Sequence, residues 1–253
     1  MTDSLIVTRS GAVTTLTLNR PDRLNTLSPD LISAIEGTVA ALRNDTETRA
    51  VVVAGTGRAF CAGVEVGDTE YNPLNARTFL KNLNRVFDDL EQLPQPTIAA
   101  IQGHAVAGGL ELALACTFRV ASTEARLGLP EVTLGLVAAV GTTSRLPRLV
   151  GFGRAAEMAL LGDLITAETA LSWGLINRIA PEGEVLNSAL ALADRLAQGP
   201  PVAISLFKDA LYAQNTSAGL LEVLSASVNH YTKDKIEGMN AFFERRPPHF
   251  TGK

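Results

Sequence analysis

Two glutamates, Glu111 and Glu131, are the side chains in this sequence with the clearest potential for chemistry. Each borders a long uncharged segment, because residues 92–110 and residues 132–144 contain no Asp, Glu, Lys or Arg. An ionised carboxylate that is buried without a partner is strongly destabilising, so such groups pair, raise their pKa or take part in reactions. A structural explanation stays open for each. A helix dipole favours an acid in its first turn, and Glu131 can cap a helix or pair with an arginine.

Backbone donors are expected close to the first glutamate. Gly108 stands where a strand-like run ends and an apolar helix begins, so its N–H should be unpaired and should favour a developing negative oxygen. Glu111 follows three residues later on the same helix face. The glycine-punctuated loop of residues 57–64 can supply a second donor, the N–H of Val64. Two such amides beside an acid predict an oxyanion hole with acid–base catalysis.

The elements that must position these groups alternate between strands and helices. Strands are expected at four apolar or alternating segments that end at turn residues: 13–18, 50–54, 97–101 and 118–122. Helices are expected after an N-cap at Ser28, over about residues 76–91 and over residues 108–116. This alternation predicts an α/β core with parallel strand pairing and crossover connections.

The chain changes character after residue 198. Residues 199–253 contain no convincing strand, and we predict two helices there, over about 202–214 and 217–244, before a proline-rich tail. The second helix carries more apolar residues than so small a region can bury, which indicates a subunit interface. We therefore predict a core of residues 1–198 that contains the active site and a helical region of residues 199–253 that builds the oligomer.

The overall composition argues against several classes of protein. A chain of 253 residues that is 46% hydrophobic can bury a large core, and a net charge of −4 offers no footprint for nucleic acid or an anionic membrane. Prolines, glutamines and glycines divide residues 92–110 into pieces too short to span a bilayer. The two cysteines and three histidines lack metal-ligand spacing, so no metal is expected. The N-terminal residues show no targeting signal, and a cytoplasmic location is expected.

Short motifs occur in a fixed order through nearly the whole chain. They include Asn19-Arg20-Pro21, Phe60-Cys61-Ala62-Gly63, Gly108-Gly109-Leu110-Glu111, Pro130-Glu131-Val132-Thr133-Leu134-Gly135 and Arg145-Leu146-Pro147-Arg148. In this order they resemble the enoyl-CoA hydratase/isomerase superfamily, also called the crotonase superfamily. The resemblance implies a crotonase-like superhelix of ββα units, an acyl-CoA thioester substrate, and a homotrimer that often pairs into a hexamer. No separate cofactor is implied, because coenzyme A is part of the substrate.

The resemblance also implies roles for individual residues. The amides of Val64 and Gly108 would hold the thioester oxygen, and Glu111 and Glu131 would be the two catalytic acids. Other positions would contact the CoA ester, the last two from a neighbouring subunit: Arg23, Leu24, Ala62, Glu65, Val66, Gly109, Phe243 and Arg245. For Arg245 the alternative is a solvated helix end, where a cation is favoured by the helix dipole.

Residues 137–143 depart from this resemblance. Superfamily members usually have a Pro-Gly-x-Gly-Gly-Thr turn, whereas this chain reads Val137-Ala138-Ala139-Val140-Gly141-Thr142-Thr143. Fewer glycines make a less permissive turn beside the acyl group. Retention of both glutamates favours an enoyl-CoA hydratase, which adds water across the 2,3 double bond. Two alternatives stay open: an enoyl-CoA double-bond isomerase, and a catalytically silent scaffold that binds acyl-CoA.

Overall fold

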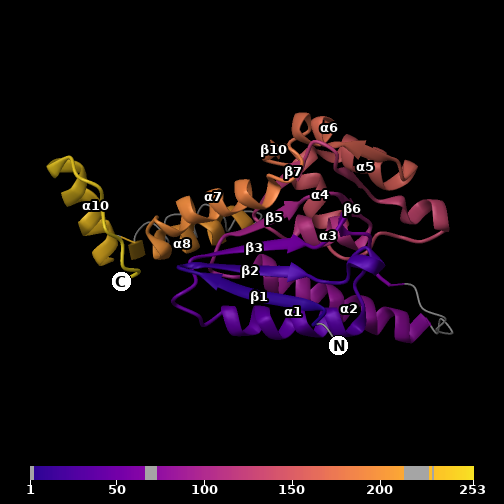
Figure 1. Ribbon diagram of the computed structural model, residues 1–253, viewed down its shortest axis with the longest axis horizontal. Coiled ribbons are helices and arrows are strands. Elements are labelled where there is room, and N and C mark those ends of the chain that lie inside the picture. The colour runs from indigo at the N-terminus through magenta and orange to yellow at the C-terminus, as the bar shows by residue number, and fades with distance from the viewer. Residues whose placement is uncertain (1–2, 66–72, 214–227, 230) are drawn as a thin grey trace.

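A six-stranded sheet runs through the centre of the molecule (Figure 1). The computed structural model describes residues 3–65, 73–213, 228–229 and 231–253. The strands are, in order across the sheet, β1 (Leu5–Ser10), β2 (Val13–Leu18), β3 (Ala50–Gly55), β5 (Thr97–Ile101), β7 (Phe118–Ser122) and β10 (Arg178–Ala180). The β1–β2 pair is antiparallel and the other neighbouring pairs are parallel. The four predicted strands and their parallel pairing are confirmed.

A second sheet has four short strands. Their order is β4 (Ala59–Cys61), β6 (His104–Val106), β8 (Arg126–Gly128) and β9 (Leu164–Thr166). β4, β6 and β8 each follow a strand of the larger sheet, and a helical element comes next each time. The chain therefore repeats a ββα unit, and the predicted superhelix is confirmed. Three-residue strands are too short to show the alternation that would reveal them in a sequence.

Helices cover both faces of the larger sheet. Val51 and Val53 of β3 belong to the hydrophobic cluster that includes α1 and α2, whereas Val52 and Ala54 belong to the cluster that includes α7. Successive strand residues point to opposite faces, so a strand that is buried on both faces is apolar throughout. The helices and 3-10 turns are η1 (Pro21–Arg23), α1 (Pro29–Leu42), α2 (Pro73–Glu91), α3 (Gly108–Leu114), η2 (Pro130–Leu134), α4 (Thr142–Val150), α5 (Phe152–Leu161), α6 (Ala167–Ser172), α7 (Val185–Ala197), α8 (Pro201–Tyr212) and α10 (Lys233–Glu244).

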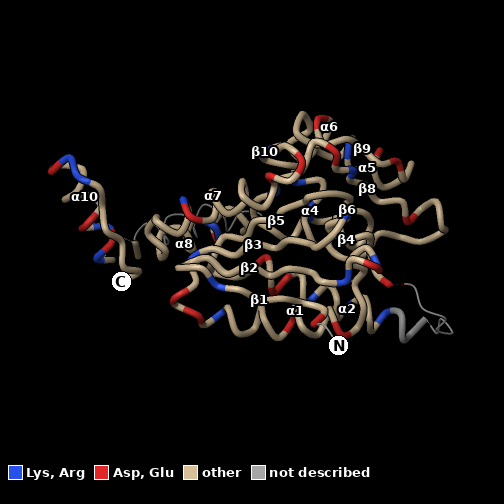
Figure 2. The backbone as a smooth tube through the Cα atoms, in the orientation of Figure 1, with Lys and Arg blue, Asp and Glu red and all other residues tan. Residues whose placement is uncertain are grey.

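Charged residues of both signs are interspersed along the chain (Figure 2). The uncharged segment of residues 92–110 contains β5 and β6 rather than one long helix. In the part of the chain that the structure describes, none of the helices combines the length and the apolar character that crossing a bilayer requires.

The C-terminal helices extend away from the two sheets (Figure 1). Lys208 connects α8 to the core, because its Nζ donates hydrogen bonds to the backbone carbonyls of Glu91 and Leu93. α10 has its own N-cap, Thr232, whose backbone is extended and whose side chain accepts a hydrogen bond from the Lys235 amide. The predicted single helix over residues 217–244 is therefore wrong, because the Thr232 hydroxyl caps a separate helix. The division of the chain at residue 198 stays a prediction.

Candidate active site

Glu111 lies in the first turn of α3, a helix whose residues are all buried. The helix begins directly after Ala107, which has a positive φ of 52°. This conformation costs a non-glycine residue about 1–3 kcal/mol and persists only where the surrounding structure imposes it. Gly109 allows α3 to pack closely on β4, because a Cβ atom there would lie 2.0 Å from the carbonyl oxygen of Cys61. The backbone of residues 107–109 therefore determines where Glu111 lies.

The backbone amides of Val64 and Gly108 are close neighbours. A Cβ atom added to Gly108 would lie 3.3 Å from the Val64 nitrogen. Val64 is held in place by a parallel bridge to Leu27, whose amide donates to the Gly63 carbonyl at 2.8 Å. Among the residues that the structure describes, neither the Val64 amide nor the Gly108 amide donates to an acceptor. Two unpaired N–H groups side by side are suited to binding a negative oxygen.

The carboxylate of Glu111 is bound by the turn that leads into α4. Glu111 is only 3% exposed, and its Oε1 accepts hydrogen bonds from the Val140 amide at 2.8 Å and the Thr142 hydroxyl at 2.6 Å. Burial raises the pKa of Glu111, whereas the Thr142 hydroxyl, the Val140 amide and the charge of Arg145 oppose that rise. The dipole of α3 alone therefore does not account for this buried acid.

Glu131 lies in η2 and is half-buried. Its Oε2 atom is buried without a hydrogen-bond partner among the described residues. Burial raises the pKa of Glu131 to about 7; the Glu131 backbone amide opposes this rise, and the charge of Glu111 adds to it. The N-cap of η2 is Leu129, and within the described ranges no arginine pairs with Glu131, so neither structural explanation for this acid holds. Burial is the largest cause of the raised pKa of Glu131, and the charge of Glu111 is a smaller one.

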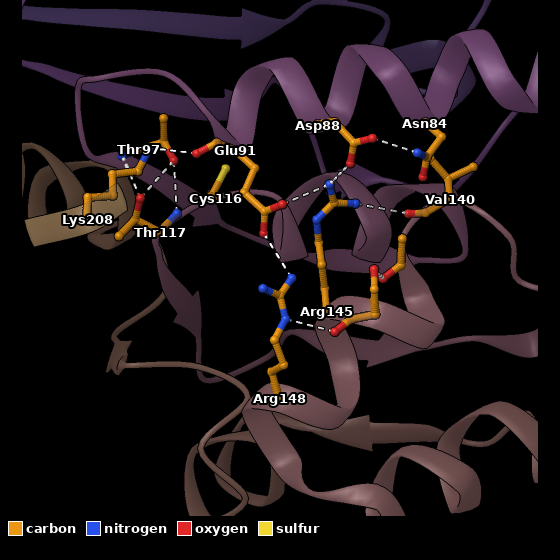
Figure 3. Close-up of polar contacts among 12 residues, drawn as sticks. Asn84, Asp88, Glu91, Thr97, Cys116, Thr117, Val140, Arg145, Arg148 and Lys208 are labelled. Carbon is orange, nitrogen blue, oxygen red and sulfur yellow. Dashed lines mark hydrogen bonds and ion pairs between the residues drawn. The ribbon is translucent and has the colours of Figure 1, made fainter. Parts of the chain in front are cut away.

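A buried arginine supports the turn that binds Glu111 (Figure 3). Arg145 of α4 is 2% exposed, and its Nη2 lies 3.1 Å from the Oε2 of Glu91 in α2. Arg145 Nη1 also donates to the Val140 carbonyl at 3.5 Å. Gly141 has a φ of 81°, which favours glycine, and a Cβ atom there would lie 1.7 Å from Arg145 Nη1, so a larger residue would be strained and would displace the guanidinium. The turn of residues 140–142 is therefore held between α2 and α4.

The chain matches known proteins over almost its entire length. The sequence profile of the enoyl-CoA hydratase/isomerase family matches residues 8–253. The chain belongs to this family. A short-chain-enoyl-CoA hydratase from Clostridium acetobutylicum is 36% identical over 250 residues, which cover 96% of each chain. A 2,3-dehydroadipyl-CoA hydratase from Escherichia coli is 36% identical over 254 residues, which cover 98% of this chain and 99% of the relative.

Solved structures of this family share the fold. The crystal structure of an enoyl-CoA hydratase from Bacillus anthracis matches with a TM-score of 0.94 and 35% identity, over 99% of this chain and 100% of that one. An enoyl-CoA hydratase structure from Mycobacterium smegmatis matches with a TM-score of 0.93 and 30% identity, over 98% of both chains. The two-sheet arrangement of ββα units is therefore the fold of the enoyl-CoA hydratase/isomerase family.

Several residues that the family resemblance assigns to the CoA ester lie near the amide pair. Leu24, next to Arg23 at the end of η1, accepts a hydrogen bond from the Ala62 amide at 3.0 Å. Glu65 forms an ion pair with Arg20 at 2.9 Å. The segment that follows β2 and the loop that follows β4 therefore lie together, next to Gly109 on α3. Contact of these residues with a CoA ester stays a prediction.

The structure does not bring two further residues assigned to the CoA ester near the amides of Val64 and Gly108. Phe243 belongs to α10 and Arg245 is its C-cap, and α10 lies at the opposite end of the molecule from β4 and β6 (Figure 2). Phe243 and Arg245 of this chain therefore do not lie near Val64 in the structure. Val66 lies outside the described residues. Their contacts with the CoA ester also stay predictions.

The contacts of residues 140 and 142 with Glu111 were not anticipated from the sequence. The sequence of residues 137–143 indicates only a turn with less conformational freedom, because it contains fewer glycines than the family turn. The available signal was two hydroxyl residues, Thr142 and Thr143, at the end of a turn otherwise made of small and apolar residues. A hydroxyl in such a turn is a hydrogen-bond donor that requires a partner when it is buried.

Proposed function

We propose that this chain is an enoyl-CoA hydratase, which adds water across the 2,3 double bond of an enoyl-CoA thioester. The observation that carries the proposal is that the amides of Val64 and Gly108, which have no acceptor among the described residues, lie at the start of the helix that holds one of two interacting carboxyl groups. Full-length relatives that are named as enoyl-CoA hydratases support the same reaction.

In the proposed reaction the thioester oxygen accepts hydrogen bonds from the amides of Val64 and Gly108. These bonds make C3 electrophilic and stabilise the enolate charge that develops on the oxygen. As the water oxygen bonds to C3, ionised Glu111 takes one of the water protons, and neutral Glu131 delivers its own proton to C2. The product is a 3-hydroxyacyl-CoA. Glu111 is left neutral and Glu131 ionised, and a proton exchange through solvent restores the starting state.

The division of roles follows from the surroundings of the two acids. Burial raises the pKa of Glu111, but the two donors on Oε1 and the charge of Arg145 oppose this rise and favour the ionised form. Within the described part of the chain the Oε2 of Glu131 has no hydrogen-bond partner, and burial raises the pKa of Glu131 to about 7, so a large fraction is neutral near physiological pH. Two carboxyl groups in such different surroundings are suited to act as base and acid.

The proposed reaction needs no redox cofactor, because addition of water leaves the overall oxidation state unchanged. The amide pair supplies the polarisation of the thioester, so the proposal includes no metal, and coenzyme A enters with the substrate. A cytoplasmic location stays a prediction.

We also propose that residues 199–253 build a homotrimer or a hexamer. Large apolar side chains are exposed on the described parts of α8 and α10: Phe207, Leu211, Ile236, Met239, Phe242 and Phe243. Apolar surfaces of this kind usually mark protein–protein contacts. In such an oligomer, α10 of a neighbouring copy would bring Phe243 and Arg245 to the CoA ester.

The test is hydration of crotonyl-CoA by the purified protein, followed as the loss of the ultraviolet absorbance of the conjugated thioester. Glu111→Gln and Glu131→Gln should each lower kcat by about 10²-fold or more. Unchanged hydration in both variants would show that the assigned roles are wrong. A series of 2-enoyl-CoA thioesters of increasing length then identifies the preferred acyl chain.

The same assay separates the alternatives. Conversion of a 3-enoyl-CoA to the conjugated 2-enoyl-CoA, without hydration of the latter, would identify an isomerase. Binding of CoA esters without turnover at any chain length would identify a silent scaffold.

A further inference from the structure

Thr142 is the first residue of α4, and its side chain is buried against Glu111. It is 3% exposed, and its Oγ1 lies 2.6 Å from Glu111 Oε1. In the Pro-Gly-x-Gly-Gly-Thr turn, a glycine precedes the final threonine, whereas in this chain Thr142 precedes Thr143. The family resemblance therefore does not imply this hydroxyl, and its contact with the acid is a property of this chain.

The backbone that carries Thr142 is fixed by the first turn of α4. The Gly141 carbonyl accepts hydrogen bonds from the Ser144 amide at 3.2 Å and the Arg145 amide at 2.8 Å, which closes the first turn of α4. Threonine is β-branched and has few χ1 choices in a helix, and burial restricts this side chain further. The hydroxyl therefore needs little reorganisation to donate to Glu111.

The contact favours one protonation state of Glu111. An O–H group that donates to an ionised carboxylate forms a shorter and stronger hydrogen bond than one between neutral groups, with typical distances of about 2.5–2.7 Å. The Thr142 hydroxyl therefore opposes the effect of burial on the pKa of Glu111, as the Val140 amide does. Both donors bind Oε1, so they also fix the rotation of the carboxylate.

We propose that Thr142 is a positioning residue for the water-activating base of this enzyme. Its hydroxyl holds Glu111 Oε1, favours the ionised form of Glu111, and turns Oε2 toward the water that is to be deprotonated. The inference rests on the proposed hydratase function, and it adds a residue that determines the pH range in which that function operates.

The experiment compares Thr142→Val with Thr142→Ser in the pH profile of kcat/KM for crotonyl-CoA. When the pH is lower than the pKa of the base in the free enzyme, kcat/KM decreases. Valine has nearly the shape of threonine but no donor, so the pKa of Glu111 should rise and the acidic limb should move to higher pH by about one unit or more. At pH values on the acidic limb, kcat/KM of the valine variant should be about tenfold lower than that of the wild type. Serine keeps the donor and should restore the wild-type limb.

Two results would overturn the inference. The first is an acidic limb of the Thr142→Val profile that lies at the same pH as in the wild type. The second is an equal shift for valine and serine, which would show that the shift does not depend on the hydroxyl donor. Should valine prevent folding, Thr142→Ala replaces it, because a smaller side chain introduces no clash, and the comparison with serine decides in the same way.

A double-mutant cycle tests whether the effect passes through Glu111. In a Glu111→Gln background the valine substitution should change the residual kcat/KM by less than about twofold, because the acid that it acts on is gone. A full, additive loss in that background would overturn the inference. A wild type that hydrates no 2-enoyl-CoA of any length would overturn the hydratase function itself, whereas an active wild type with an unmoved valine limb would overturn only the role of Thr142.

Discussion

Arg145 of α4 and Glu91 of α2 form an ion pair of 3.1 Å, in which the two side chains are 2% and 14% exposed. The attraction between such charges is largely offset by the free energy of removing them from water, so the pair has its greatest effect when one partner is lost. Arg145 also contacts Asp88 and the Val140 carbonyl. The ion pair therefore connects α2 to the turn that binds the Glu111 carboxylate.

Glu91→Gln should destabilise the protein and slow catalysis. Loss of one charge from a buried pair costs about 3 kcal/mol, which corresponds to a Tm lower by roughly 5–10 °C. We also expect a lower kcat with crotonyl-CoA, because the support of residues 140–142 is weakened. Thermal unfolding and steady-state kinetics measure the two effects. Glu36→Gln is the matched control, since Glu36 pairs with Arg85 between exposed positions of α1 and α2. Equal Tm changes in the two variants would contradict the expectation.

Cys61 and Cys116 should be unreactive in the native protein. Both are buried, and burial raises the pKa of each thiol to about 12. The thiolate is the reactive form, so almost none is present at about pH 8. A chromogenic disulfide reagent should label neither cysteine in the native protein and both after unfolding in guanidinium. Rapid labelling of the folded protein would show that one of these thiols is accessible, and Cys61→Ala would identify which.

Gly108→Ala should reduce catalysis far more than stability. The added methyl group would lie 3.3 Å from the Val64 nitrogen and 3.1 Å from Val64 Cγ2, so small shifts can accommodate it. It would nevertheless occupy the space next to the amide pair, and loss of one oxyanion donor typically lowers kcat by about 10²-fold or more. Kinetics and thermal unfolding of the same sample separate the two effects.

Gly37→Ala provides the control for that substitution. Gly37 lies in α1, where a Cβ atom would meet no other atom within 4 Å. Alanine should stabilise this helix by about 0.5–1 kcal/mol and leave kcat at the wild-type value. A Gly108→Ala enzyme with wild-type kcat would show that the amides of Val64 and Gly108 do not hold the thioester oxygen.

Long elements with one clear period could be predicted from the sequence. β3 was recognisable as a strand buried on both faces, because all its residues from Ala50 to Ala54 are apolar and buried. Ser28 caps α1 as predicted, since its side chain accepts a hydrogen bond from the Leu31 amide. The position of Glu111 in the first turn of α3 followed from the spacing to Gly108. The glycine-punctuated loop of residues 57–64 also indicated Val64 as a second donor, and the structure places the Val64 amide next to Gly108.

Short elements and turn contacts could not be predicted in the same way. β4, β6 and β8 are held by pairing with one another rather than by their own sequences. The partner of the Thr142 hydroxyl depends on how α3 packs against α4, which the sequence of the turn does not contain. Thr232 lies within an apolar helical pattern, which predicts that a helix continues through it. Its hydroxyl instead accepts a hydrogen bond from the Lys235 amide, so Thr232 caps the start of α10.

Glu131 should make the protein less stable as the pH rises through neutrality. Its pKa rises from an ordinary value of 4.5 to about 7 in the folded state, so the folded protein binds this proton more tightly than the unfolded chain. The resulting contribution to stability is complete below about pH 4.5 and is lost as the pH rises through about 7. Glu131→Gln, which stays neutral, should therefore match the wild-type Tm near pH 4.5 and exceed it at about pH 8.

The expected gain in Tm is about 2–5 °C, less than the full pKa change would imply, because Glu131 is partly accessible to solvent. Glu182→Gln, at an exposed position, is the control and should give the same small difference at both pH values. A Tm advantage of Glu131→Gln that does not grow with pH would contradict the burial of an unpaired acid. In the proposed reaction Glu131 delivers this same proton to C2, so kcat/KM of the wild type should decline over the same pH range in which this stability is lost.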